Sequence, residues 1–104
     1  MEVSKYSGIE DLARIFKALS DPNRLAILQV LRECCGAECR LPTDASGNSV
    51  SEIAKCFYLA LSTVSHHLKE LKNAGLINCS KRGQWVYCSP NQEALKQIRE
   101  FVGG

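Results

Sequence analysis

One segment of the chain, residues 60–88, restricts the possible folds more strongly than any other. It begins as an amphipathic helix over residues 61–74 and continues into two β-favouring runs on either side of Gly83. At about 100° per residue, one side of this helix is an apolar line formed by Val64, Leu68 and Leu71. The far side carries short hydrogen-bonding groups and a cation: Ser62, His66, Lys69 and Asn73, with Thr63 and Ser65 on its flanks. The pattern predicts a helix that buries one face and presents the other.

The rest of this segment supports a helix followed by a hairpin. Gly75 suits the left-handed conformation that ends many helices, and Gly83 can supply the positive φ that a hairpin tip requires. His67 lies near the apolar edge of the helix, so we expect it to be packed rather than presented. Lys81 and Arg82 are expected at the tip of the hairpin.

Four more helices are predicted, over residues 9–19, 22–33 and 49–57 and after Ser89 and Pro90. Asp21 can cap the second helix, where Pro22 suits the first position, and Ser49 with Glu52 forms a capping-box pattern for the third. The order is helix, helix, helix, helix, hairpin, helix. We therefore predict one small domain, residues 1–104, that is mainly α with a β-hairpin wing. Since a short turn joins the third and fourth helices, the predicted fold class is a winged helix-turn-helix.

The charge of the chain is unevenly distributed. Residues 55–85 hold five cations against the single acid Glu70, although the whole chain has a net charge of only +2. This concentration points to a polyanion as partner, although solvated lysines explain the charge alone equally well. The chain has no apolar run of the roughly 20 residues that span a bilayer, and it has no apolar leader. We expect a protein of the reducing cytoplasm with no membrane contact, whose six cysteines begin as thiols.

The polar side of the 61–74 helix suits double-stranded DNA. Ser, Thr and His side chains are short enough for a helix to enter the major groove, where they can bond base edges or phosphates. Lys69 and Lys72, with Lys81 and Arg82 on the hairpin, would neutralise phosphates. An amphipathic surface helix beside a surface hairpin is the simpler alternative, and a winged helix that binds only protein is another.

Four stretches carry a resemblance to a known family: "FKALSDPNRLAILQVLRE", "SVSEIAKC", "STVSHHLKELKNAGLI" and "KRGQWVY". In order and spacing they resemble the ArsR/SmtB winged-helix repressors over nearly the whole chain. The resemblance implies a homodimer built on the first and last helices, a palindromic operator, and release of DNA when a metal, metalloid or oxidant reaches a cysteine or histidine site. It also implies that the recognition face consists of Ser62, Thr63, Ser65 and His66.

Two positions depart from the common pattern of that family. Ala60 stands where a Ser or Thr cap is usual, and Leu61 stands where Gln is frequent. We expect Leu61, which lies near the apolar face of the helical wheel, not to read a base by hydrogen bonding. We therefore expect operator preference to differ from that of relatives.

The cysteine pattern limits the possible effector sites. Ser49 and Ser51 occupy the positions of a Cys-x-Cys pair found in many relatives, and the last helix contains no His. The remaining candidates are Cys34, Cys35 and Cys39, whose thiolates would suit a soft ion such as As(III), Cd or Zn as an effector, with no obligatory cofactor. A structural role for these thiols and a redox or reactive-sulfur switch at the vicinal pair are the alternatives.

The other three cysteines are expected to be structural. Cys56 is predicted to be a small core residue, while Cys79 and Cys88, on the two arms of the hairpin, could approach each other but are expected to be ordinary strand residues. The chain has no C-x-x-C and no glycine-rich cofactor loop. We therefore do not expect an enzyme, and a small thiol oxidoreductase is the weakest of the alternatives.

Overall fold

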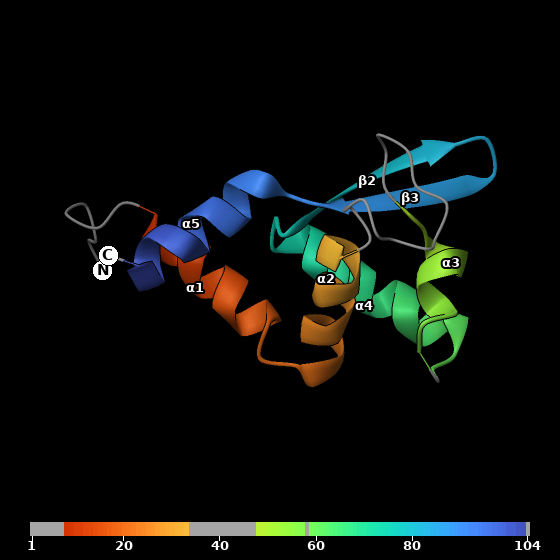
Figure 1. Ribbon diagram of the computed structural model, residues 1–104, viewed down its shortest axis with the longest axis horizontal. Coiled ribbons are helices and arrows are strands. Elements are labelled where there is room, and N and C mark those ends of the chain that lie inside the picture. The colour runs from red at the N-terminus through yellow and green to blue at the C-terminus, as the bar shows by residue number, and fades with distance from the viewer. Residues whose placement is uncertain (1–7, 34–47, 58, 104) are drawn as a thin grey trace.

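The computed structural model describes residues 8–33, 48–57 and 59–103, and Figure 1 shows how their elements are arranged. The elements are α1 (Ile9–Ala18), α2 (Pro22–Glu33), β1 (Asn48–Ser49), α3 (Val50–Ala54), α4 (Leu61–Asn73), β2 (Ile77–Arg82), β3 (Trp85–Pro90) and α5 (Gln92–Gly103). Helices α1 and α5 lie together at one end of the molecule, and the β2–β3 hairpin extends at the other (Figure 1). The predicted mainly α architecture with a hairpin wing is confirmed.

Helix α2 begins as the sequence predicts. The Asp21 carboxylate accepts hydrogen bonds from the backbone N–H of Asn23 at 2.7 Å and of Arg24 at 3.3 Å. Pro22 is the first helical residue, where its missing N–H costs no hydrogen bond. Asp21 therefore satisfies the free N–H groups of the first turn and sets where the helix starts.

Helix α4 ends at Gly75, also as predicted. Gly75 has φ of 79° and donates its N–H to the Lys72 carbonyl at 2.9 Å, while Leu76 donates to the Leu71 carbonyl at 3.0 Å. These two bonds form a Schellman motif, which reverses the chain direction without leaving the last carbonyls unsatisfied. Because Leu76 is fully buried, the motif also anchors the start of the hairpin in the core.

The sheet has one strand more than the predicted hairpin. Strands β2 and β3 are antiparallel, and the two-residue β1 pairs with the other edge of β3, through Ser49 and Tyr87, to give the order β1-β3-β2. Ser49 therefore belongs to a strand, and α3 is shorter than the predicted 49–57 helix. The pairing partner of β1 lies almost 40 residues away in the sequence, so no local sequence pattern predicts this strand.

The start of α5 also differs in detail from the prediction. Pro90 is the last residue of β3, opposite Ile77, and does not open the helix. The cap is Asn91, whose side-chain oxygen accepts from the N–H of Glu93 at 2.9 Å and of Ala94 at 3.4 Å. An Asn side chain at this position satisfies first-turn donors in the way that Asp21 does for α2.

The core draws residues from every helix and from both long strands. Its fully buried members of largest volume are Ile27, Leu31, Ile53, Leu71, Leu76, Val64 and Cys88. Cys56 is exposed, contrary to the prediction. Because α3 ends at Ala54, the helical angle that placed Cys56 near Ile53 does not apply beyond that point. None of the helices in the described ranges is long and apolar enough to cross a bilayer.

Candidate nucleic-acid interface

Helix α4 separates its two faces as the sequence analysis expected. Val64, Leu68 and Leu71 are buried against the rest of the protomer. The opposite side is open to solvent, with Ser62, Ser65, His66 and Lys69 exposed and Thr63 partly buried. The structure therefore places five of the predicted contact residues on one accessible surface, which we call the α4 outer face. Their contact with DNA remains a prediction.

A polar network holds α4 from beneath. His67 is only 8% exposed, as predicted for a packed residue, and its Nδ1 accepts from Arg24 Nε at 3.4 Å. Arg24 also donates to the Ala18 carbonyl at 3.3 Å and lies 3.9 Å from the Asp21 carboxylate. One guanidinium thus joins the end of α1, the start of α2 and the middle of α4. Sequence analysis missed Arg24, although its position three residues after a capping Asp was a usable signal.

The same network acts on the Asp21 carboxyl. Partial desolvation works to raise the pKa of Asp21, but the backbone N–H groups of Asn23 and Arg24 and the positive charge of the Arg24 guanidinium outweigh it. The pKa of Asp21 is therefore lower than usual. The carboxylate stays ionised at neutral pH, so both its capping bonds and its attraction for Arg24 are retained.

The first turn of α4 is unusual. Ala60 occupies the cap position with extended φ and ψ of −63° and 148° and makes no side-chain cap bond, as expected from the sequence. Leu61 is 53% exposed, although it lies near the apolar side of the helical wheel. It is the first residue of the helix, and the buried line begins one turn later at Val64. An apolar side chain consequently stands beside the α4 outer face.

The wing carries the remaining predicted contacts. Gly83 has φ of 61°, and no described residue other than glycine has positive φ, which matches a type II′ turn over Gly83 and Gln84. Lys81 is exposed on β2, and Arg82 ends that strand opposite Trp85. The turn therefore brings both basic positions close to the tip, where they can flank a duplex entered by α4.

The cysteines divide into two groups. Cys34, Cys35 and Cys39, the predicted effector residues, lie outside the described residues. Cys79 and Cys88 face each other across β2 and β3, with their Sγ atoms 3.2 Å apart. Within the described ranges, no group of three or more His, Cys, Asp or Glu side chains is arranged to hold a metal ion.

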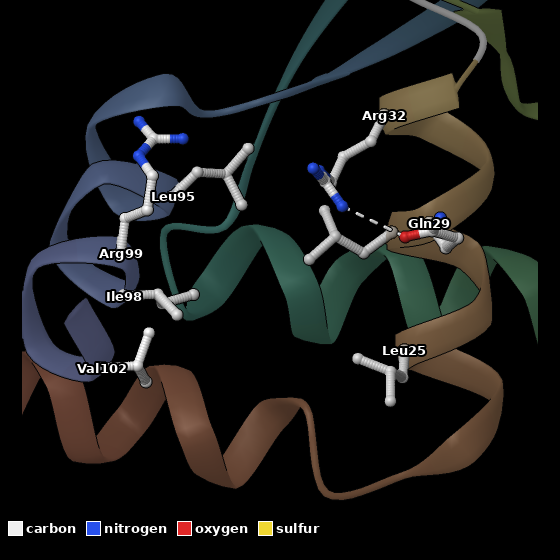
Figure 2. Close-up of a pocket in the computed structure, with 8 residues that line it drawn as sticks. Leu25, Gln29, Arg32, Leu95, Ile98, Arg99 and Val102 are labelled. Atoms are coloured by element: carbon white, nitrogen blue, oxygen red, sulfur yellow. Dashed lines mark hydrogen bonds between the residues drawn. The ribbon is translucent and has the colours of Figure 1, made fainter.

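A different surface forms where α1, α2 and α5 meet. Phe16 of α1 and Phe101 of α5 lie with ring centroids 5.5 Å apart, yet both remain exposed. Beside them, a groove runs between α2 and α5, with Leu25 on one side and Leu95, Ile98 and Val102 on the other (Figure 2). Arg32 and Arg99 line its polar margin (Figure 2). This apolar surface lies on different elements from the α4 outer face.

Comparisons with known proteins agree with this arrangement. A helix-turn-helix domain family matches residues 19–80. The chain is 38% identical over 93 residues to a Staphylococcus aureus cadmium resistance transcriptional regulatory protein CadC homolog; this match covers 86% of the chain but 65%, less than two thirds, of that relative. It is 32% identical over 91 residues to the arsenical resistance operon repressor of Staphylococcus xylosus, covering 88% and 76% of the two chains.

Solved structures show the same fold. An ArsR family transcriptional regulator superimposes with a TM-score of 0.71 at 30% identity, covering 89% of each chain. A homodimeric winged helix-turn-helix DNA-binding domain from Mycobacterium bovis superimposes with a TM-score of 0.71 at 26% identity, covering 99% of this chain and 84% of that one. The elements, the exposed face of α4 and these similarities lead to one conclusion: the chain belongs to the ArsR/SmtB family of winged helix-turn-helix transcriptional regulators, which are not enzymes.

Proposed function

We propose that this chain, acting as one domain over residues 1–104, is a cytoplasmic repressor that binds a palindromic DNA operator as a homodimer. The observation that carries the proposal is the α4 outer face. Ser62, Thr63, Ser65 and His66 are polar, short and accessible, while the opposite side of the same helix is fixed in the core. Hydroxyl and imidazole groups on a helix of this kind can bond base edges in the major groove.

Basic residues supply the rest of the DNA contact. Lys69 on α4 and Lys81 on the wing are exposed, and Arg82 lies next to Lys81 at the hairpin tip. Cations beside a recognition helix neutralise phosphates and orient the protein without reading sequence. In this arrangement α4 enters the groove, and the wing follows the adjacent backbone.

The dimer is proposed on the apolar surface of α1 and α5. Phe101 is 59% and Val102 70% exposed, although both belong to the apolar stripe of an amphipathic helix. A second copy covering these side chains would remove them from water, and the similar M. bovis domain is homodimeric. A twofold pair would present two α4 helices about 34–36 Å apart, one turn of DNA, which matches a palindrome.

Leu61 adds a specificity element that the usual family pattern lacks. Its exposed side chain stands at the entry of the proposed groove-binding helix and cannot donate or accept a hydrogen bond. Apolar groups in the major groove contact the methyl group of thymine. We therefore assign Leu61 a preference for thymine at the position it meets.

Binding-site selection from random duplex DNA, followed by titration at several salt concentrations, tests the DNA proposal. Ser65→Ala and His66→Ala should weaken operator binding by about 1–3 kcal/mol each where they meet a base, and Lys69→Gln should lower the salt slope by about 1. Lys96→Gln, an exposed lysine on α5, is the matched control and should leave both quantities unchanged. Equal affinity of all four variants would remove α4 from the interface.

The effector is proposed to be a thiophilic metal or metalloid, such as As(III), Cd or Zn, bound by Cys34, Cys35 and Cys39. Support comes from the preference of thiolates for soft ions and from similarity to proteins named for cadmium and arsenical resistance. Binding would favour a dimer geometry that fits the operator poorly. Coupling between two such sites is typically about 1–3 kcal/mol, or roughly 5–150-fold in affinity.

Titrating operator DNA with arsenite, cadmium or zinc tests the effector. The wild-type protein should lose affinity with at least one ion, and Cys34→Ser, Cys35→Ser or Cys39→Ser should abolish the loss. Cys56→Ser, at an exposed cysteine elsewhere, is the control. If no ion changes affinity and mild peroxide or polysulfide does so through the Cys34–Cys35 pair, the thiol-based redox alternative replaces metal sensing.

A further inference from the structure

The wing contains a pair of thiols at a register position that favours a cross-strand bond. Asn91 N–H donates to the Leu76 carbonyl at 2.8 Å, which places the hydrogen-bonded positions of the ladder at this pair and at every second pair toward the tip. Cys79 and Cys88 fall on the alternate, non-hydrogen-bonded positions. Opposed Cα atoms at such positions are about 4.5 Å apart, which lies within the range that a disulfide spans.

The side chains of the two cysteines point toward each other. The Sγ atoms of Cys79 and Cys88 are 3.2 Å apart, so their orientations converge rather than diverge. Cys88 is 1% exposed and belongs to the core, whereas Cys79 is partly open to solvent. A small reagent can therefore reach Cys79 first, while the buried Cys88 lies close enough to react with a modified Cys79.

The surroundings favour a thiolate at Cys79. The hydrogen bond from Cys88 lowers the pKa of Cys79 to about 7, against partial burial, and the positive charge of Lys72 acts in the same direction. The same hydrogen bond and burial raise the pKa of Cys88, which remains a thiol. Among the described residues, the charged side chains that line the adjoining depression are those of Lys69 and Lys72, both from α4.

We propose that Cys79 and Cys88 form a second thiol site, which hydroperoxides oxidise to an intrachain disulfide. The Cys79 thiolate attacks the terminal oxygen of the hydroperoxide, the O–O bond breaks, and with one proton an alcohol or water leaves, so that Cys79 becomes a sulfenic acid. Cys88 sulfur then attacks Cys79 sulfur, the S–O bond breaks, and hydroxide takes the thiol proton and leaves as water. The two cysteines lose two electrons to the peroxide.

The position of this pair connects it to the α4 outer face. Cys79, Cys88 and Val86 line a depression of about 370 Å³ together with Ser65, Lys69 and Lys72 of α4. A disulfide draws the two sulfurs to about 2.05 Å and removes the Cys79 charge beside Lys72. We expect this change to alter operator affinity at least about fivefold, the lower end of typical coupling between sites, and this consequence rests on the proposed function.

Thiol mapping of the wild-type protein tests the site. The reduced protein is treated with hydrogen peroxide, blocked with N-ethylmaleimide and digested without reductant. We expect a Cys79–Cys88 linked peptide that dithiothreitol removes and whose yield is independent of protein concentration. In a variant that combines Cys34→Ser, Cys35→Ser, Cys39→Ser and Cys56→Ser, intact mass should fall by two hydrogen atoms. Recovery of both thiols, or linkage of Cys79 or Cys88 only to other cysteines, would overturn the proposal.

Single variants assign the two sulfurs in that background. Cys88→Ala should stop at a Cys79 sulfenic acid that dimedone traps, and Cys79→Ser should leave Cys88 unmodified. Alkylation of Cys79 should rise with pH around a midpoint near 7, and Lys72→Gln should move that midpoint upward. If Cys88→Ala does not fold, the wild-type peptide map still decides the question. Sulfenic acid at Cys88 rather than Cys79 would contradict the assignment.

Operator titration separates this site from the proposed function. Disulfide formation with unchanged DNA affinity would overturn the coupling and leave the site in place. Absence of DNA binding by the reduced protein would reject the repressor proposal, whereas the peptide map would stand unaffected.

Discussion

Helices α4 and α5 are both amphipathic, yet their apolar faces are buried to different extents. In α4, Val64, Leu68 and Leu71 are all buried within the protomer. In α5, Ala94 is buried, but Phe101 and Val102 are exposed although they belong to the apolar stripe. An apolar face that is buried within the protomer stabilises the fold, whereas an apolar face left exposed to solvent favours contact with another apolar surface. The comparison thus separates the helix proposed to contact DNA from the helix proposed to contact a second subunit.

The largest effect is expected from truncating the buried face of α4. Leu71→Ala should lower the free energy of unfolding by about 2–5 kcal/mol, because Leu71 is fully buried and the change leaves a cavity. Urea denaturation followed by circular dichroism measures this. Leu61→Ala, which removes the same atoms from an exposed position of the same helix, should cost less than about 0.5 kcal/mol. Equal costs would show that the two ends of α4 are not packed differently.

The exposed face of α5 should respond in assembly instead. Phe101→Asp should weaken dimerisation by about 2 kcal/mol or more, roughly 30-fold, because a charge replaces an aromatic contact at the centre of the proposed interface. Sedimentation at several concentrations measures this, and circular dichroism should show retained helix. Glu100→Ala, which changes the charge by one unit of opposite sign at the neighbouring exposed residue, is the control. A monomeric wild-type protein, or a dimer unaffected by Phe101→Asp, would contradict the assignment of this face.

The network beneath α4 offers a third, intermediate test. Arg24→Leu should destabilise the protomer by about 1–3 kcal/mol, since it leaves the buried His67 nitrogen without its donor. Arg14→Leu removes an exposed ion pair with Asp11 and should cost about 0–1 kcal/mol. Thermal unfolding of both variants at one protein concentration gives the comparison. Equal midpoints would mean that Arg24 does not anchor α4.

The smallest effect is expected at the entrance of the recognition helix. Leu61→Gln should leave stability within about 0.5 kcal/mol, because Leu61 is exposed. It should change base preference at a single position, away from thymine, by about 1 kcal/mol. Parallel selection of binding sites by the wild type and the variant measures this. An unchanged preference would place Leu61 outside the groove.

Much of the fold could be predicted from local patterns. The start of α2 follows from Asp21 and Pro22, the end of α4 from Gly75, and the hairpin tip from Gly83, because caps and turns depend on neighbouring residues only. The burial of His67 followed from its angle on the helical wheel. Strand β1 and the exposure of Cys56 could not be predicted, because the first depends on a distant pairing and the second on where α3 ends.

The candidate sites divide in the same way. The faces of α4 were evident from periodicity, but Arg24 reaching His67 was not, because the two are 43 residues apart. The approach of Cys79 to Cys88 was partly predictable. Once a two-residue turn at Gly83 and Gln84 is assumed, both cysteines lie the same number of residues from it and must be paired.

By itself, the sequence determined the approximate positions of the helices, the start of α2, the end of α4 and which side of α4 is polar. These features follow from the 3.6-residue period and from caps, which act within a turn. Tertiary structure alone decided that the apolar face of α4 is buried whereas part of the apolar face of α5 stays exposed. It also decided that Arg24 donates a hydrogen bond to His67 and that the sulfurs of Cys79 and Cys88 converge. Each of these depends on which surfaces meet in space, and packing between distant segments sets that rather than any local preference.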